Sequence, residues 1–212
     1  MRRGGVRPVM VVIHYTGMDS AEAALDRLCD PAAEVSAHYL IAASGAVFAL
    51  VPEAMRAWHA GAGRWGSVTD VNSASIGIEL ANTGRTPYAA AQMRALEQLL
   101  AGVMARHGIA PERVIGHSDM APLRKADPGA RFDWLRLARQ RLSVWPDPRG
   151  AVPAPDAAAF DAAAVTFGYD PDIAHDTRLA AFRLRFRPWA AGPVGSADMA
   201  TITDLARRYP AL

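Results

Sequence analysis

The sequence predicts an α/β fold, in which a mixed central β-sheet is flanked by helices and followed by a small three-helix domain. Two observations support the sheet: short apolar runs rich in β-branched residues recur along residues 1–147, and segments with helical spacing lie between them. Strands that alternate with helices are typical of one sheet covered by helices. A third observation, a proline-rich stretch near residue 150, separates this part from further helical segments.

The strands are expected where apolar runs are short and bounded by turn residues. Five segments meet this description, at residues 8–14, 37–42, 47–51, 75–80 and 114–116. Ser44-Gly45 lies between the second and the third of them, which is typical of a β-hairpin. The pattern therefore predicts a sheet whose strands include one antiparallel pair.

Three helices are expected between and after these strands. Ser20 is a suitable N-cap for a helix that extends to about Cys29. Apolar residues recur every three to four positions over residues 89–107, and Gly108 is suited to ending that helix. A last helix is expected over residues 132–142.

The proline-rich stretch divides the chain into two predicted domains. Residues 1–147 form the first, and residues 148–155 form a semi-rigid linker, because closely spaced prolines favour an extended chain. Residues 156–212 form the second, with helical patterns over 156–167, 177–186 and 196–208. A domain of this size has a marginal hydrophobic core by itself.

Composition narrows the class of protein. The formal net charge of the 212 residues is +2, with both signs interspersed, so nucleic acid is not expected as a partner. Cys29 is the only cysteine, which excludes an intramolecular disulfide. No apolar run reaches the roughly 18 residues of a transmembrane helix. The sequence carries no export signal, which predicts a cytoplasmic protein; a periplasmic or outer-membrane-associated location is expected if the N-terminus has been trimmed.

Two separate stretches carry the residues of a predicted metal site. His14 ends the first strand, and residues 116–129 contain His117, Asp127 and, two residues before the aspartate, Lys125. Considered one at a time, each residue has an ordinary interpretation: the histidines as packed residues, the aspartate as a turn residue and the lysine as a surface charge. Together, two imidazoles and one carboxylate are a ligand set of catalytic zinc, with the fourth position left to water. We therefore predict one zinc ion per chain.

Two further residues complete the predicted chemistry. Amide hydrolysis requires a base for the attacking water and a cation for the developing oxyanion. Glu79 ends an apolar strand, where partial burial would raise its pKa, so it is the predicted base. Pairing of Glu79 with an arginine is the structural alternative. Lys125 lies close to a ligand in the chain and is the predicted oxyanion partner.

Five motifs carry a resemblance to a known family. They are Ile13-His14-Tyr15-Thr16, Val35 to Ile41, Ala57-Trp58-His59-Ala60-Gly61, Ser75 to Asn82, and residues 116–129. Over residues 8–147 the chain resembles the zinc N-acetylmuramoyl-L-alanine amidases of the AmpD/AmiD branch, with the greatest likeness to AmiD. The resemblance implies cleavage of the amide bond between N-acetylmuramic acid, or its 1,6-anhydro form, and L-alanine of peptidoglycan.

The resemblance also assigns residues. It implies zinc at His14, His117 and Asp127, with Glu79 and Lys125 as catalytic partners. Trp58 and His59 are expected on the wall of a substrate cleft, although a core position suits Trp58 almost as well, and Asn82 is a further candidate for substrate binding. His38 is expected to be packed or to support a ligand.

Related phage amidases and peptidoglycan recognition proteins often carry a tyrosine and a cysteine where this chain has Ala37 and Asp127. The acid–base role therefore falls on Glu79. The alternative function is that of a non-catalytic peptidoglycan recognition protein. Loss of His14, His117, Asp127 or Glu79 would favour this alternative, and all four residues are present. A different zinc amidase or peptidase is a weaker alternative, and the absence of a His-Glu-x-x-His motif excludes the usual zincin design.

The second predicted domain has a resemblance of its own. Residues 167–170 and 180–188 resemble the three-helix peptidoglycan-binding domain. The resemblance implies a module that tethers the enzyme to peptidoglycan fragments or to the sacculus, which would raise its effective concentration there. On this interpretation, residues 1–147 alone cleave small soluble muropeptides. The structural alternative is a helical cap on the first domain.

Overall fold

The computed structural model describes residues 5–211, and a five-stranded sheet with the order β3-β2-β4-β1-β5 lies at its centre. The strands are β1 (Met10–Tyr15), β2 (Tyr39–Ile41), β3 (Val47–Ala49), β4 (Ser75–Leu80) and β5 (Val114–Gly116). β1 pairs in parallel with β4 and β5, and β4 pairs in parallel with β2. β2 and β3 form the antiparallel hairpin that Ser44-Gly45 predicts. The expected mixed sheet is confirmed.

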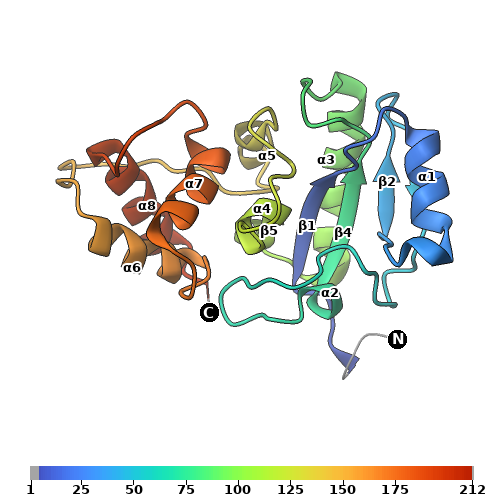
Figure 1. The fold of residues 1–212 in the computed structure, drawn as a ribbon, viewed down its shortest axis with the longest axis horizontal. Helices are drawn as coiled ribbons and strands as arrows, with labels where there is room; N and C mark the ends of the chain where they lie inside the picture. Colours follow the sequence, from blue (N-terminus) through green and yellow to red (C-terminus); the bar gives the residue numbers. More distant parts are fainter. Residues whose placement is uncertain (1–4, 212) are drawn as a thin grey trace.

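Short and long helices surround this sheet (Figure 1). They are α1 (Ala21–Cys29), α2 (Val71–Ala74), α3 (Ala90–His107), α4 (His117–Met120) and α5 (Trp134–Arg139), with 3₁₀ turns at Pro31–Ala33 and Pro111–Arg113. The Ser20 side chain caps α1 as expected, and Gly108 ends α3 with a left-handed backbone, φ 67°. α5 is shorter than predicted because Asp133 accepts a hydrogen bond as its N-cap and so starts the helix at Trp134.

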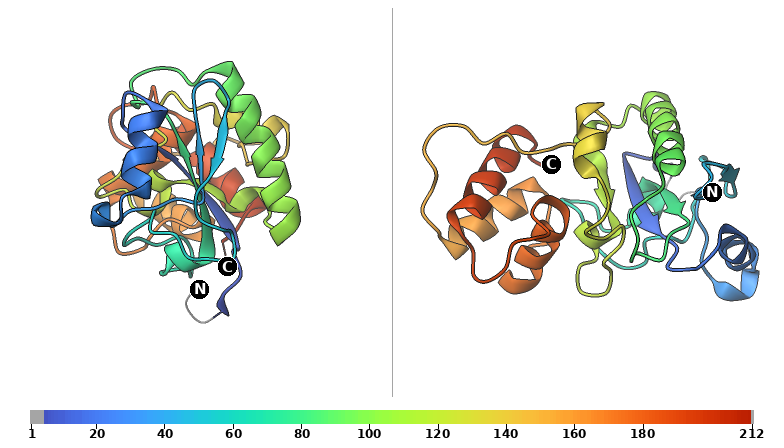
Figure 2. Two further views of the ribbon diagram at one scale, coloured as in Figure 1. Left: turned by 90° about the vertical axis from the view of Figure 1, so that its right-hand side faces the viewer. Right: turned by 90° about the horizontal axis from the view of Figure 1, so that it is seen from above.

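The C-terminal part consists of α6 (Ala157–Phe167), α7 (His175–Phe186) and α8 (Ser196–Arg208), close to the predicted helical segments. Residues 140–156 connect α5 to α6, and the part over residues 146–155 contains no helix or strand. In Figures 1 and 2, α6–α8 lie together beyond α4 and β5, on the side of the molecule away from α1. No helix within residues 5–211 is long and apolar enough to cross a membrane.

The two faces of the sheet carry different side chains. Val11 and Ile13 of β1, with Ile76, Ile78 and Leu80 of β4, belong to one apolar cluster with α3. Successive residues of a strand point to opposite faces, so the residues between them lie on the other face. In β4 these are Ser75, Gly77 and Glu79, none of which is a large apolar residue. This second face therefore leaves room for a functional site.

The C-terminal helices share a second apolar cluster with the sheet. Met10 and Val12 of β1 and Trp65 join Phe160, Phe167, Phe182 and Phe186 of α6 and α7 in one buried group. The Trp65 ring lies edge-on to the rings of Phe167 and Tyr169, with centroids 5.4 and 5.1 Å apart. A side chain on Gly168 would meet the Trp65 ring at 2.5 Å. The two predicted domains are therefore packed closely together.

Polar contacts reinforce this packing. Arg185 of α7 donates to Asp119 of α4 at 2.7 Å, and the Tyr169 hydroxyl donates to the same carboxylate at 2.9 Å. The Arg185 and Asp119 side chains are each only 1% exposed. Asp119 also accepts from the backbone N–H of Gly116, the residue before His117. The C-terminal helices therefore contact the element that begins at a predicted metal ligand.

Candidate active site

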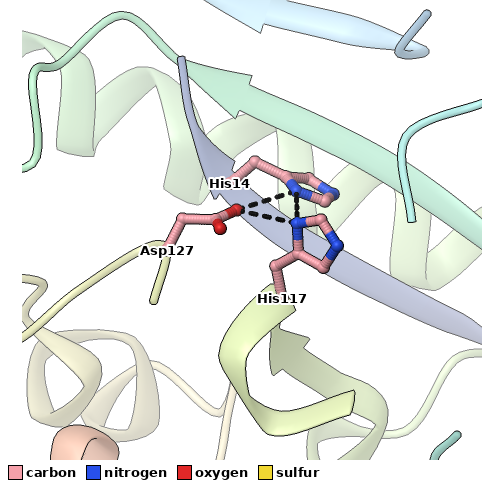
Figure 3. A group of neighbouring side chains, drawn as sticks. All are labelled: His14, His117 and Asp127. Atoms are coloured by element: carbon pink, nitrogen blue, oxygen red, sulfur yellow. Dashed lines mark hydrogen bonds and ion pairs between the residues drawn. The ribbon is translucent and has the colours of Figure 1, made fainter. Parts of the chain in front are cut away.

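The predicted metal ligands come together from three different elements (Figure 3). His14 lies in β1, His117 is the first residue of α4 directly after β5, and Asp127 lies in the loop that follows α4. Pro128 and Gly129 follow Asp127, and the Asp127-Pro128 peptide bond is cis. Glu79 is the neighbour of His14 in the parallel pairing of β4 with β1. The sheet therefore brings the two strand residues side by side on its second face.

The three ligand atoms form a tight triangle. His14 Nδ1 and His117 Nδ1 are 2.9 Å apart, and each lies 3.0 Å from Asp127 Oδ2. In the protonation state that binds a metal, each of the three atoms carries a lone pair and no proton, so each can only accept. Hydrogen bonds therefore cannot join all three pairs of atoms. A cation at the centre satisfies all three. Two imidazoles and one carboxylate fit zinc and leave an open coordination position.

Burial and mutual contact shift the titration of these groups. Burial, together with the neighbouring His117, lowers the pKa of His14 to about 4, and Asp127 opposes this shift. Burial opposes ionisation of Asp127, but hydrogen bonds with His117 and His14 outweigh this and hold its pKa well below the usual range. His14 is therefore neutral and Asp127 ionised near pH 7, as metal ligands must be.

Glu79 has the environment that the sequence predicts for a base. Its Oε2 atom is buried and accepts no hydrogen bond from any residue in the described range, 5–211. Burial and the charge of Asp127 raise the pKa of Glu79 to about 8, and the nearby Lys125 opposes the shift. Among the described residues, the charged neighbours that shift this pKa are Asp127 and Lys125, so the structural alternative of pairing with an arginine finds no support there. A carboxyl group that titrates near neutral pH suits proton transfer.

An open cleft of about 500 Å³ contains all of these groups. His14, Glu79, His117, Lys125 and Asp127 line it. Lys125 is exposed, so its ammonium group is available to a ligand in the cleft. The structure thus brings together every residue for which the sequence predicts a metal-binding or catalytic role. Those roles themselves remain predictions.

The predicted substrate residues take three different positions. Trp58 is 52% exposed on the wall of the cleft, so its interpretation as a core residue is wrong. His59 also lines the cleft but is almost fully buried between His14 and Ser75. Asn82 is buried outside the cleft lining, where its side chain accepts from Gly84 N–H and donates to the Thr86 carbonyl. Its role in substrate binding has no structural support here.

His38 is packed, as expected, and not a ligand. It is fully buried, its Nε2 donates to the Met55 carbonyl, and its Nδ1 accepts from the Gly77 N–H. Sequence reasoning overlooked Arg124, which lines the cleft and donates to the carbonyls of Ala60 and Ala62. Its place beside Lys125 was the available signal. Asn72 and Ser75, which hydrogen-bond to the backbone and the ring of His59, were also overlooked, because nothing in their local sequence marks them.

Comparisons with known proteins agree with this geometry. The family model of N-acetylmuramoyl-L-alanine amidase matches residues 4–130. The amidase AmiD of Escherichia coli (strain K12) is 37% identical, over 92% of this chain and 80% of its own length. The 1,6-anhydro-N-acetylmuramyl-L-alanine amidase AmpD of Enterobacter cloacae is 43% identical, over 49% of this chain and 55% of its own length.

Solved structures extend the likeness to the whole chain. Escherichia coli AmiD, in complex with its substrate anhydro-N-acetylmuramic acid-L-Ala-D-γ-Glu-L-Lys, covers 100% of this chain with a TM-score of 0.87 and 33% identity. AmpDh3 of Pseudomonas aeruginosa, in complex with anhydromuramic pentapeptide, covers 100% with a TM-score of 0.88 and 31% identity. Family match, sequence identity and fold agree, and the chain therefore belongs to the N-acetylmuramoyl-L-alanine amidase family.

Proposed function

We propose that this protein hydrolyses the amide bond between N-acetylmuramic acid, or its 1,6-anhydro form, and the L-alanine of the peptidoglycan stem peptide. The single observation that carries the proposal is the convergence of His14, His117 and Asp127 in one open cleft with Glu79, whose buried Oε2 atom has no hydrogen-bond partner within residues 5–211. The relatives named as amidases of this bond, and the two solved complexes with anhydromuropeptides, support the choice of substrate.

The three ligand atoms fit a zinc ion, which would be held by His14 Nδ1, His117 Nδ1 and Asp127 Oδ2. When bound, zinc supplies Lewis-acid chemistry that activates water and polarises the scissile carbonyl group. The chain supplies the remaining requirements of amide hydrolysis, which are proton transfer, stabilisation of charge and orientation of the substrate.

Glu79 takes the proton from the attacking water as the new carbon–oxygen bond forms. It then gives this proton to the alanine nitrogen as the carbon–nitrogen bond breaks, so one carboxyl group serves as base and acid. Lys125 lies in the same cleft with its charge unburied, where it balances the negative charge that develops on the carbonyl oxygen. Trp58 offers an exposed aromatic surface to the substrate.

We also propose that residues 1–147 carry the catalytic groups and that α6–α8 contact the peptidoglycan. A hollow of about 490 Å³ supports this second part, because it is lined by Asp176, Thr177 and Leu184 of α7 together with Lys125 and Ala126 of the cleft. A substrate that extends out of the cleft would meet α7 there. Pull-down with sacculi of the full chain and of a Thr177→Trp variant, which fills the hollow, tests this contact.

Two measurements test the enzymatic proposal. Elemental analysis is expected to find one zinc ion per chain, and mass spectrometry is expected to find free stem peptide after incubation with anhydromuropeptide. His14→Ala and His117→Ala are expected to lose zinc and activity together. Full activity of thoroughly metal-free protein would disprove the metal site. Binding of muropeptide without any product would instead support the recognition protein that is the alternative function.

A further inference from the structure

A chain of hydrogen bonds runs from His14 away from the ligand triangle. His14 Nε2 lies 3.0 Å from His59 Nδ1, and His59 Nε2 lies 3.2 Å from the Ser75 hydroxyl oxygen. The Ser75 hydroxyl donates its one proton to the Val71 carbonyl, which only accepts. The hydroxyl oxygen must therefore accept from His59 Nε2.

The Val71 carbonyl, at the end of this series of hydrogen bonds, sets the donor and acceptor roles in each of the others. Because His59 carries its proton on Nε2 when neutral, its Nδ1 accepts from His14 Nε2. His14 then carries its own proton on Nε2 and presents the lone pair of Nδ1 to the ligand triangle. The Val71 carbonyl thus selects the tautomer of His14 that a metal ligand needs, with the proton on Nε2 and the lone pair on Nδ1.

The second predicted ligand, His117, is oriented in the same way by Ala60, the residue that follows His59 in the sequence. His117 Nε2 lies 2.9 Å from the Ala60 carbonyl oxygen and must donate to it, which leaves His117 Nδ1 unprotonated in the neutral ring. The side chain of His59 therefore orients one ligand, and the backbone of Ala60 orients the other.

One buried side chain holds this pair of residues in place. Asn72 Oδ1 accepts from the backbone N–H of His59 at 3.0 Å and from that of Ala60 at 2.8 Å. Asn72 is only 7% exposed. Space for the His59 ring comes from Gly77 in β4, where a Cβ atom would lie 2.3 Å from that ring.

We propose that the His59-Ala60 dipeptide, clamped by Asn72, is the positioning element that fixes the tautomer and direction of both metal-binding histidines. This inference rests on the zinc site proposed above. It changes the role of His59 from a residue of the substrate-binding wall to a positioning residue. Both ring nitrogens of His59 are engaged, by His14 and by Ser75, so neither is directed to a substrate.

The affinity for zinc, measured by chelator competition, tests the proposal. Loss of an outer partner of a ligand typically weakens metal binding about 10–100-fold. His59→Ala and Asn72→Ala are therefore expected to raise the zinc Kd by about this factor. His59→Asn places an acceptor oxygen near the position of Nδ1 and is expected to recover part of the affinity.

Gln92→Leu is the matched control. Gln92 is also a fully buried amide that bridges two backbone groups, since its Nε2 donates to the carbonyls of Ile41 and Ala81 on the α3 side. Its loss is expected to lower Tm without changing the zinc Kd. A fall in zinc affinity in this control equal to that of Asn72→Ala would reduce the Asn72 effect to general destabilisation and overturn the proposal.

Two further readouts separate the competing outcomes. Long-range ¹H–¹⁵N spectra of the imidazole rings are expected to show the Nε2–H tautomer for His14, His59 and His117 in the zinc-loaded protein. With zinc saturated, the KM of the His59 variants for muropeptide is expected to stay near the wild-type value. An Nδ1–H tautomer of His59, or a raised KM with an unchanged zinc Kd, would refute the positioning role. Failure of the wild-type protein to bind zinc would refute the metal site itself.

Discussion

The two faces of the sheet differ in how they are covered. On one face, strand residues such as Ile76 and Ile78 pack against α3, and all members of this cluster come from the first 147 residues. On the other face, Met10 and Val12 pack with helices that follow residue 156, while Glu79 and its neighbours form the site. The first face is complete within the first predicted domain, whereas the second is completed by the C-terminal helices.

The polar contacts of the two faces differ as well. The α3 side has the Gln92 bridge to two carbonyls, which links neighbouring parts of the same domain. The second face has the buried pair of Asp119 and Arg185, which connects α4 to α7. Loss of one partner of such a buried pair is strongly destabilising, because it leaves an uncompensated buried charge. The C-terminal helices thus complete a core and fix the element that carries His117.

Removal of the C-terminal helices is the most severe test of this comparison. A fragment ending at Asp147 would expose Trp65, Met10 and Val12, which are at most 1% exposed in the full chain. Such a contiguous apolar surface favours aggregation. We expect the fragment to be largely insoluble and to lack activity on small muropeptides, as opposed to the independent first domain that the sequence suggests. A soluble fragment with native circular dichroism and full activity on anhydromuropeptide would show that the second face needs no cover.

Adjacent residues of β4 allow the two faces to be compared directly. Glu79→Gln on the site face is expected to lower turnover about 10²–10⁴-fold, because Gln keeps the shape without the basicity, and to leave zinc bound. Ile78→Ala on the α3 face is expected to cost about 2–5 kcal/mol of unfolding free energy, with turnover of the folded protein near normal. Steady-state kinetics, zinc analysis and urea unfolding of both variants give the answer. Near-normal turnover of zinc-loaded Glu79→Gln would require another base.

The buried pair and an exposed pair provide a second contrast. Arg185→Met leaves the Asp119 carboxylate buried without its cation, and breaking a buried pair in this way costs about 3–5 kcal/mol. Arg149→Met removes the exposed partner of Asp147, for which the expected cost is about 0–1 kcal/mol. Urea unfolding at neutral pH measures both. Equal, small effects would mean that the contact between α4 and α7 is not a structural anchor.

The last contrast concerns the pH dependence of stability in the metal-free protein. The folded state raises the pKa of Glu79 from 4.5 to about 8, so between these values it holds a proton that the unfolded chain has released. Stability from this site therefore falls as the pH rises from about 4.5 to about 8. Gln at this position never ionises. Chelator-treated Glu79→Gln is thus expected to melt several degrees above wild type at pH 9 and at the same temperature as wild type at pH 4. A difference in Tm between the two proteins that is the same at both pH values would contradict the burial of Glu79.

Local patterns in the sequence were sufficient for most elements of secondary structure. The Ser20 cap, the Gly108 terminus of α3 and the Ser44-Gly45 hairpin follow from interactions between residues close in the chain. The ends of α5 were less well predicted, because the competing cap at Asp133 moved its start. The group of His14, His117 and Asp127 was also predictable, because few functions other than metal binding require that combination of residues at strand ends and turns.

Tertiary structure alone decided which groups surround the site. Asn72 and Ser75 look like ordinary polar residues until the fold places them against His59, and Arg185 resembles a surface charge of an amphipathic helix until α7 meets Asp119. Exposure of Trp58 and close packing of α6–α8 on the sheet depend in the same way on contacts between distant segments. The sequence by itself determined most elements and the choice of His14, His117 and Asp127 as candidate metal ligands, because spacing and residue type act locally. The partners of each ligand and the cover of each face depend on which surfaces meet, and only the folded chain decides that.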